Sequence, residues 1–127
     1  MTETGEQMSN SAIVEAFIDG WNRMDWDLVV GLLAEDVFYH NIPMEPINGR
    51  AQAEAFIRGM APQSVDWQLI AIAENGAQVL TERIDNFVMA DGKTVSLPVM
   101  GTFEIEEGKI KAWRDYFDLQ TFTSQMA

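Results

Sequence analysis

The sequence contains no cysteine and only one histidine, His40, among its 127 residues. Without thiols the chain can form neither disulfides nor thiolate metal sites, and it has no cysteine nucleophile. A single histidine also excludes any metal site that needs several imidazole ligands. A site made of carboxylates alone stays possible, but no recognisable ligand spacing indicates one, so we expect no metal.

Basic residues are scarce, because 8 Lys and Arg stand against 20 Asp and Glu, which gives a formal net charge of −12. This charge repels phosphate backbones, so we expect no nucleic-acid partner. The first residues are acidic and polar and do not resemble a signal peptide, and no apolar stretch approaches the length of a membrane span. We therefore expect a cytoplasmic protein without a membrane partner. The negative charge would slow the approach of an anionic substrate but not of a neutral one, and solubility alone explains it equally well.

Length and composition predict a single domain. Hydrophobic residues make up 47% and charged residues 22%, which is typical of a globular chain. A chain of this length has no room for a second comparable core. We expect residues 1–10 to form a flexible N-terminal tail and residues 11–127 to form the domain, with Asn10 or Ser11 capping its first helix.

Apolar spacing predicts that helices come first and strands follow. Helical periodicity indicates helices over 12–23, 26–33 and 51–60, and residues 37–41 between them look extended. Asn48-Gly49-Arg50 has the composition of a turn. Four strands are expected over 66–74, 77–89, 94–105 and 109–117, separated by turn sequences that suit hairpins. The segment 119–126 receives no assignment.

This order predicts an α+β fold. Strands this long should curl strongly, which gives a curved mixed or antiparallel sheet. With the N-terminal helices closing its open side, the sheet would form a cone with an internal pocket, and such a pocket is a natural ligand site.

Three segments place polar residues among apolar neighbours at a spacing of two. Because side chains alternate along a strand, Arg83 shares a face with Asp85, and Tyr39 shares one with Asn41. Asp115 lies between Trp113 and Phe117 in the same way. Alternation alone does not decide which face of strand 77–89 is inside, and one Arg–Asp pair is more often a surface ion pair. The agreement of three segments favours a site, in which Arg83 would have to pair with the buried carboxylates. The expected polar set is Tyr39, Asn41, Arg83, Asp85 and Asp115, and the expected walls are Phe87, Leu97, Val99, Trp113 and Phe117.

The same residues resemble the limonene-1,2-epoxide hydrolase family. The matching pieces are Tyr39-His40-Asn41 with Pro43, then Thr81-Glu82-Arg83-Ile84-Asp85, then the run from Trp113-Arg114-Asp115 to Leu119. The likeness extends over nearly the whole chain after Ser11. It implies the cystatin-like cone of the wider nuclear-transport-factor-2-like and SnoaL-like superfamily, a homodimer through the sheet, and no metal or organic cofactor.

The resemblance also implies roles for the polar residues. Asp115, Tyr39 and Asn41 would hold and activate a water, Asp85 would act as the acid, and Arg83 would bridge the two aspartates. Trp113 would shape the pocket wall. The implied reaction is the one-step addition of water to an uncharged, terpene-like or other cyclic epoxide, giving a vicinal diol. Such a reaction needs an acid for the leaving oxygen and a base for the water at the same time.

Two other functions stay open at this point. A ketosteroid-isomerase-like or polyketide-cyclase-like enzyme on the same fold would use one aspartate as base, although it has no evident use for Arg83 between two aspartates. A non-catalytic, dimeric small-molecule-binding module would keep the pocket, although burying these polar groups is costly without a purpose. The sequence leaves open the size of the substrate, the stereochemistry, and which aspartate carries the proton at rest. His40 faces away from Asn41 and is expected to be structural or at the dimer surface.

Overall fold

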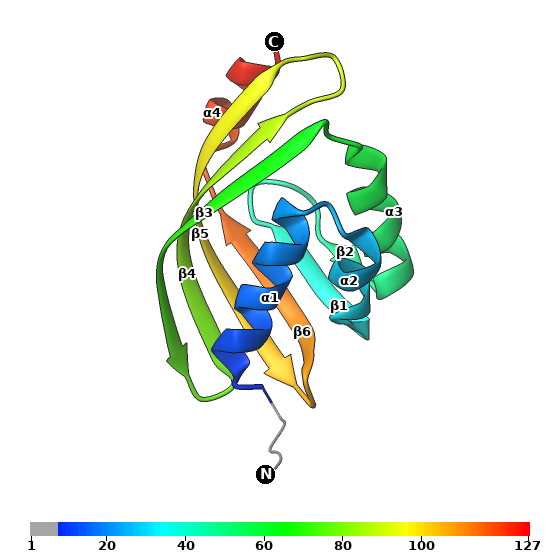
Figure 1. Ribbon diagram of the computed structural model, residues 1–127, viewed down its shortest axis with the longest axis vertical. Helices are drawn as coiled ribbons and strands as arrows, with labels where there is room; N and C mark the ends of the chain where they lie inside the picture. The colour runs from blue at the N-terminus through cyan, green and yellow to red at the C-terminus, as the bar shows by residue number, and fades with distance from the viewer. Residues whose placement is uncertain (1–7) are drawn as a thin grey trace.

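The computed structural model describes residues 8–127 and has the predicted α+β architecture (Figure 1). In chain order the elements are α1 (Asn10–Asn22), α2 (Trp26–Gly31), β1 (Leu33–Asn41), β2 (Ile47–Asn48), α3 (Arg50–Met60), β3 (Ser64–Asn75), β4 (Gln78–Val88), β5 (Thr94–Glu106), β6 (Lys109–Tyr116) and α4 (Leu119–Met126). No helix in this part of the chain is long and apolar enough to cross a membrane.

The six strands form one mixed sheet in the order β2-β1-β6-β5-β4-β3. Strands β3 to β6 are an antiparallel meander, and β1 joins its edge by pairing with β6 in parallel. Figure 1 shows the long strands β3, β4 and β5 bending around α1, while α2 and α3 lie beside β1. The expected curved mixed sheet closed by N-terminal helices is therefore confirmed, and its concave face is the one that the helices cover.

Helix α1 begins at Asn10, one residue before the predicted start of the domain. Its N-cap is Ser9, whose side chain accepts a hydrogen bond from the backbone N–H of Ala12 at 3.1 Å, so neither Asn10 nor Ser11 is the cap. The hydroxyl of Ser9 satisfies a helix N–H that has no partner within the helix. Residues 1–7 of the expected tail lie outside the described part of the chain.

Two local predictions differ from the structure, and one segment without an assignment forms a helix. Strand β1 starts at Leu33 rather than at residue 37, because Leu33 is fully buried and pairs with Ile110 on β6. The predicted turn around Asn48 contains the short strand β2, which pairs with β1. The unassigned segment forms α4, whose N-cap Asp118 accepts from the backbone N–H of Thr121. Each difference arises from contacts with distant segments or from a short cap, which periodicity does not report.

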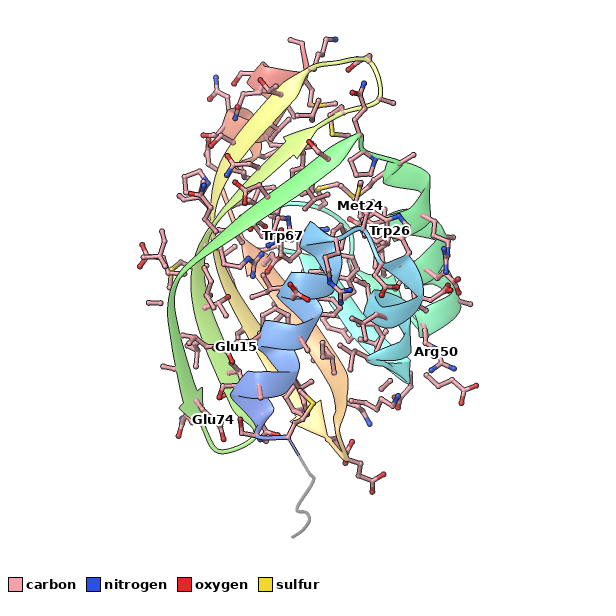
Figure 2. The ribbon with its side chains drawn as sticks, in the orientation of Figure 1. Glu15, Met24, Trp26, Arg50, Trp67 and Glu74 are labelled. Carbon is pink, nitrogen blue, oxygen red and sulfur yellow. The ribbon has the colours of Figure 1, made fainter. Side chains whose placement is uncertain are left out.

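The core between the concave face of the sheet and the helices is aromatic, with Trp113 of β6 at its centre. The ring of Trp113 stacks on Tyr39 with centroids 4.0 Å apart and on Phe103 at 5.9 Å, and it meets the edge of Phe17 of α1 at 4.9 Å. Figure 2 shows Trp67 between β3 and α1. Large rings packed in this way bury much apolar surface and fix each other's orientation, so the polar residues beside them are held on a rigid support.

Candidate active site

The polar centre of the concave face begins with Arg83 and Asp85 on β4. Alternation along this strand turns Thr81, Arg83 and Asp85 inward, and all three are buried. Nε of Arg83 donates to Oδ1 of Asp85 at 2.9 Å, and Nη2 donates to Oδ2 at 2.8 Å. This is a two-pronged pairing of guanidinium and carboxylate, which fixes both groups in one plane.

The same guanidinium reaches Asp115, two strands away on β6. Nη2 of Arg83 donates to Oδ2 of Asp115 at 3.0 Å. The intervening strand β5 places Gly101 opposite both Thr81 and Asp115. A Cβ added at Gly101 would lie 2.5 Å from Nη1 of Arg83 and 2.6 Å from Oδ1 of Asp115. The absence of a side chain at Gly101 therefore gives Arg83 the space to bridge the two aspartates.

Two further neighbours complete the surroundings of Arg83. Nη1 donates to Oγ1 of Thr81 at 3.1 Å, and the ring of Trp67 lies 4.5 Å from Cζ in a cation–π arrangement. Burial would lower the pKa of Arg83, but the negative charge of Asp115 and the hydrogen bonds with Asp85 raise it above its ordinary value. Arg83 is thus a permanent cation beside two carboxyl groups.

Burial makes Asp85 a carboxyl group that holds its proton more tightly than an ordinary aspartate does. Burial raises the pKa of Asp85 from its ordinary value of 3.8 to about 6, because it outweighs the hydrogen bonds and the positive charge of Arg83. The charge of Asp115 raises the pKa further. A carboxyl group with such a pKa can donate a proton near neutral pH, which is the property required of a general acid.

Tyr39 and Asn41 lie on β1, where they face Trp113 and Asp115 of β6 across the parallel pairing. Nδ2 of Asn41 donates to the hydroxyl oxygen of Tyr39 at 3.1 Å. Burial raises the pKa of Tyr39, and the charge of Asp115 raises it further, so the hydroxyl keeps its proton. The hydroxyl proton of Tyr39 and the amide oxygen of Asn41 therefore remain available to form hydrogen bonds with a polar ligand near Asp115.

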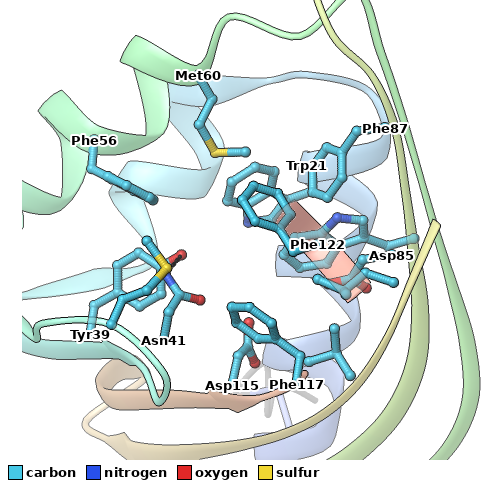
Figure 3. Close-up of a pocket in the computed structure, with 14 residues that line it drawn as sticks. Trp21, Tyr39, Asn41, Phe56, Met60, Asp85, Phe87, Asp115, Phe117 and Phe122 are labelled. Atoms are coloured by element: carbon cyan, nitrogen blue, oxygen red, sulfur yellow. Dashed lines mark hydrogen bonds between the residues drawn. The ribbon is translucent and has the colours of Figure 1, made fainter. Parts of the chain in front are cut away.

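These polar groups open onto one cavity of about 80 Å³ (Figure 3). Aromatic and aliphatic side chains form most of its wall, and the polar contribution comes from the two aspartates, Tyr39 and Asn41. The lining residues are Trp21, Tyr39, Asn41, Met44, Phe56, Met60, Trp67, Asp85, Phe87, Leu97, Val99, Asp115, Phe117 and Phe122. A few converging polar atoms in an apolar hollow suit an uncharged organic guest.

Nearly all residues expected at the pocket lie at this cavity. Phe87, Leu97, Val99 and Phe117 line it beside the polar residues, and Arg83 lies directly behind the two aspartates. Trp113 is the exception: the sequence predicted it in the wall of the pocket, and this prediction was wrong. It is fully buried, lies behind Tyr39 and does not line the cavity.

Sequence reasoning missed the contributions of the helices and of β3. Trp21 comes from α1, Phe56 and Met60 come from α3, and Phe122 comes from α4. Phe56 and Met60 lie on one side of their helix, a spacing that was visible, but nothing in the sequence told where that side would point. Further lining comes from Met44 and Trp67. Thr81 and Gly101 were also missed, because their roles depend on β5 lying between β4 and β6.

His40 lies apart from this chemistry. Its Nε2 is 2.9 Å from the backbone oxygen of Met44, and the residue does not line the cavity. Within residues 8–127, no group of three or more His, Asp or Glu side chains is arranged to hold a metal ion.

Comparison with known proteins adds a family and several similar structures. The family model described as the limonene-1,2-epoxide hydrolase catalytic domain matches residues 8–127. Epoxide hydrolase EphG of Mycobacterium tuberculosis is 34% identical over 118 residues, which cover 92% of this chain and 78% of that protein.

Two solved structures illustrate the likeness of fold. The structure of an LEH-like epoxide hydrolase from M. tuberculosis has a TM-score of 0.82 and 32% identity, covering 91% of this chain and 87% of the other. A putative polyketide cyclase from Xanthomonas campestris has a TM-score of 0.80 and 29% identity, covering 93% and 96%. The fold is therefore shared by proteins whose names assign them different reactions.

Proposed function

This chain belongs to the limonene-1,2-epoxide hydrolase family and is an epoxide hydrolase, and from this premise we propose that it adds water to an uncharged cyclic epoxide in one step. The product is a vicinal diol. The observation that carries the proposal is the position of Arg83, whose Nη2 lies 2.8 Å from Asp85 and 3.0 Å from Asp115. One cation thereby joins a candidate acid to a candidate base.

In this reaction Asp85 protonates the epoxide oxygen. Epoxide opening relieves ring strain, but an alkoxide is a poor leaving group, so a proton delivered as the C–O bond breaks lowers the barrier. The raised pKa of Asp85, about 6, supports this role because part of the protein then still carries the proton at slightly acidic to neutral pH, where an ordinary aspartate is fully ionised. Asp85 also lines the cavity, where a bound epoxide can reach it.

Asp115 acts as the base on the attacking water. Tyr39 donates to this water, Asn41 accepts from it through its amide oxygen, and Asp115 takes its proton as the new C–O bond forms. The register that sets Asn41 opposite Asp115 and Tyr39 opposite Trp113 supports this arrangement. Holding the water in a fixed place converts an encounter of two molecules into a step within one complex.

The bridging guanidinium keeps the charge of the centre balanced. Before reaction the proton is on Asp85 and the negative charge is on Asp115; after reaction the two are exchanged. Because Nη2 of Arg83 touches both carboxyl groups, either one can carry the negative charge beside the same cation. Without that cation, a buried carboxylate would be costly in one state or the other.

The substrate in this proposal is a neutral, compact, terpene-like or other cyclic epoxide. The cavity wall is mainly apolar, and two acidic groups together with a net charge of −12 disfavour an anion. The cavity of about 80 Å³ is smaller than pockets for drug-sized ligands, which usually measure roughly 300–1,000 Å³. Larger substrates therefore require the partly exposed side chains of Met44, Met60 and Phe122 to move.

The proposal includes a homodimer and no cofactor. The outer face of the sheet exposes Leu80 of β4, Met100 of β5 and Tyr116 of β6, which supports association through that face. The acid, the base and the bridging cation all come from the chain itself, so this mechanism needs neither a metal nor an organic cofactor. A cytoplasmic location belongs to the same proposal.

A panel of epoxides of graded size tests the proposed function. Purified protein is incubated with cyclohexene oxide and with monoterpene epoxides, and the products are analysed for diols. We expect diol formation by the wild type and its loss in Asp85→Asn and Asp115→Asn. Asp66→Asn, at an exposed position of β3, is the matched control and should remain active. Full activity in Asp85→Asn or Asp115→Asn contradicts the assigned role.

The same assay separates the two other functions. Turnover of an enone isomerisation or cyclisation substrate without any diol formation would indicate an isomerase or a cyclase. Tight binding of cyclic ligands without turnover would indicate a binding module. The bridge formed by Arg83 supports the hydrolase over both, because neither alternative requires a cation between two carboxyl groups.

A further inference from the structure

Two buried hydrogen-bond donors in the cavity wall take no part in the proposed mechanism. They are the indole Nε1 groups of Trp21 and Trp67, which have no hydrogen-bond partner among the described residues. Trp21 is 1% exposed and Trp67 is 4% exposed, so bulk water does not readily serve them. Nε1 of Trp113, in contrast, donates to Asp115. A buried N–H without an acceptor is unfavourable, and such a group in a native protein requires an explanation.

The two indoles form one continuous part of the wall. Their rings stack with centroids 4.5 Å apart and planes 18° apart, and both residues line the cavity. Trp67 comes from β3, the edge strand that lies farthest from β1 and β2 in the sheet. In the view of Figure 3, Trp21 lies on the side of the cavity away from Tyr39 and Asn41. The two side chains that carry the unused donors thus line the cavity on the side away from the proposed water site.

We propose that the substrate carries, besides its epoxide, a second uncharged oxygen acceptor such as a ketone, which accepts a hydrogen bond from Trp21 or Trp67. This inference rests on the proposed function and specifies its substrate class. Phenylalanine at both positions would give a similar aromatic wall without an unsatisfied donor. The presence of two indoles therefore fits an oxygenated guest better than a pure hydrocarbon.

The charge of the site selects a neutral acceptor. Asp115 carries the negative charge and opens onto the cavity, whereas Arg83 lies behind the two aspartates, so a carboxylate group on the substrate would be repelled. An indole N–H is itself neutral and offers no compensating charge. A ketone oxygen accepts a hydrogen bond without a charge, and it would fix the orientation of the ring between the indole wall and the water site.

Movable side chains surround the route to the indole nitrogens. Each nitrogen has almost no exposed surface, so an acceptor reaches it when neighbouring side chains shift. Met60 and Phe122 line the cavity and are half-buried, and methionine in particular adapts its shape at low cost. Binding of the acceptor is thus coupled to the same widening that a ring larger than the present cavity requires.

Paired substrates test the inference by kinetics. Cyclohexene oxide is compared with the same ring carrying a ketone away from the epoxide, in the wild type and in Trp21→Phe and Trp67→Phe. The quantity measured is the ratio of kcat/KM for the ketone to kcat/KM for the hydrocarbon. We expect Trp21→Phe or Trp67→Phe, whichever removes the donor to the ketone, to lower this ratio about five- to tenfold, as loss of one neutral hydrogen bond does. Trp26→Phe, which removes an indole outside the cavity lining, is the control and should leave the ratio unchanged.

Trp67→Phe must also be judged by the ratio of the two kcat/KM values and not by its absolute rates, because Trp67 contacts Arg83. This variant should slow both substrates, and only the additional loss for the ketone reports the hydrogen bond. A ratio that stays at the wild-type value in both Trp21→Phe and Trp67→Phe overturns the inference, whatever the absolute rates are.

A second readout does not depend on turnover. The chain has 4 tryptophans, whose indole N–H signals in ¹⁵N NMR spectra can be assigned from the single Trp→Phe variants. Cyclohexanone should move the signal of Trp21 or Trp67 downfield, whereas cyclohexene should not. Equal responses to both ligands, or no response to saturating cyclohexanone, overturn the inference. Absence of diol formation from every epoxide would instead refute the proposed function. The NMR result would still show whether an indole N–H of the cavity wall binds a ketone oxygen.

Discussion

The indole Nε1 of Trp113 donates a hydrogen bond to Oδ1 of Asp115 at 3.0 Å, while Oδ2 of the same carboxylate accepts from Arg83. Trp113 and Asp115 are two residues apart on β6, so both point to the concave face. Each oxygen of Asp115 is therefore held by a different donor, and the carboxylate has one orientation. In the proposed mechanism, a base that is fixed in this way does not need to reorient when it takes a proton from water.

Trp113→Phe tests this positioning. Phenylalanine keeps an aromatic ring next to Tyr39 but removes the donor to Oδ1, so we expect kcat to fall about tenfold with little change in KM. A circular dichroism spectrum and a thermal unfolding curve establish that the variant is folded. An unchanged kcat in a folded variant would show that Asp115 does not depend on Trp113 for its orientation.

Gly101→Ala should remove activity although it adds only one methyl group. The new Cβ would lie within 2.6 Å of Arg83 and Asp115, so the bridge between the aspartates has to open. We expect kcat/KM to fall by roughly 100-fold or more, since small displacements of catalytic groups have effects of this size.

Gly59→Ala is the matched control for this substitution. Gly59 lies in α3 with no atom near its added Cβ, and alanine in a helix should stabilise the protein by about 0.5–1 kcal/mol without affecting turnover. Wild-type activity in Gly101→Ala would contradict the account of how Arg83 reaches Asp115.

The pH profile of kcat/KM should report the protonation of Asp85. The acid must carry its proton in the free enzyme, so kcat/KM should fall as the pH rises through about 6, the raised pKa of Asp85. Because the two aspartates interact, the observed value belongs to the pair. A profile that is flat between about pH 5 and 8 contradicts the assignment of Asp85 as the acid.

The same pKa predicts a trend in stability. The folded state holds the proton on Asp85 more tightly than the unfolded state does, because the pKa is raised from 3.8 to about 6. The stabilisation from this group is therefore fully present below the unfolded pKa and is lost as the pH rises through about 6. Thermal unfolding over this range should show a smaller decline for Asp85→Asn than for the wild type.

Arg83→Ala should unfold much more easily than the wild type. Arg83 is fully buried, and its removal leaves Asp85 and Asp115 close together without a cation. We expect the free energy of unfolding to fall by about 3–5 kcal/mol, which urea denaturation can measure.

Arg58→Ala supplies the comparison for a surface position. Arg58 also pairs with two carboxylates, Asp27 and Glu54, but on the exposed surface, where solvent screens the pair and the loss should be much smaller than in Arg83→Ala. Similar losses in the two variants would show that the buried bridge contributes no more than an exposed one.

The strands of the site could be predicted from the sequence because alternation is a local property. Asp85 lies two residues after Arg83, so their common face was certain once β4 was recognised. Which face was inside was not certain, because both faces of β4 carry polar and apolar residues. The decision depends on α1 packing against the sheet, and no pattern within β4 contains that information.

Features made by distant contacts could not be predicted. The start of β1 at Leu33 depends on its pairing with Ile110, which is far away in the sequence. The contribution of Trp21 to the cavity depends on how α1 crosses the sheet. Trp113 has the same sequence spacing as a wall residue, but Tyr39 stacks over its face and separates it from the cavity.

A single-turnover experiment in ¹⁸O-labelled water tests the central claim most directly. The enzyme is present in excess over cyclohexene oxide, so each enzyme molecule turns over at most once. The diol is then analysed by mass spectrometry. Direct attack by the water held near Tyr39, Asn41 and Asp115 predicts one ¹⁸O atom in the diol from this first turnover. An unlabelled first-turnover diol would mean that a carboxylate of the protein supplied the oxygen through a covalent ester, and it would contradict the account.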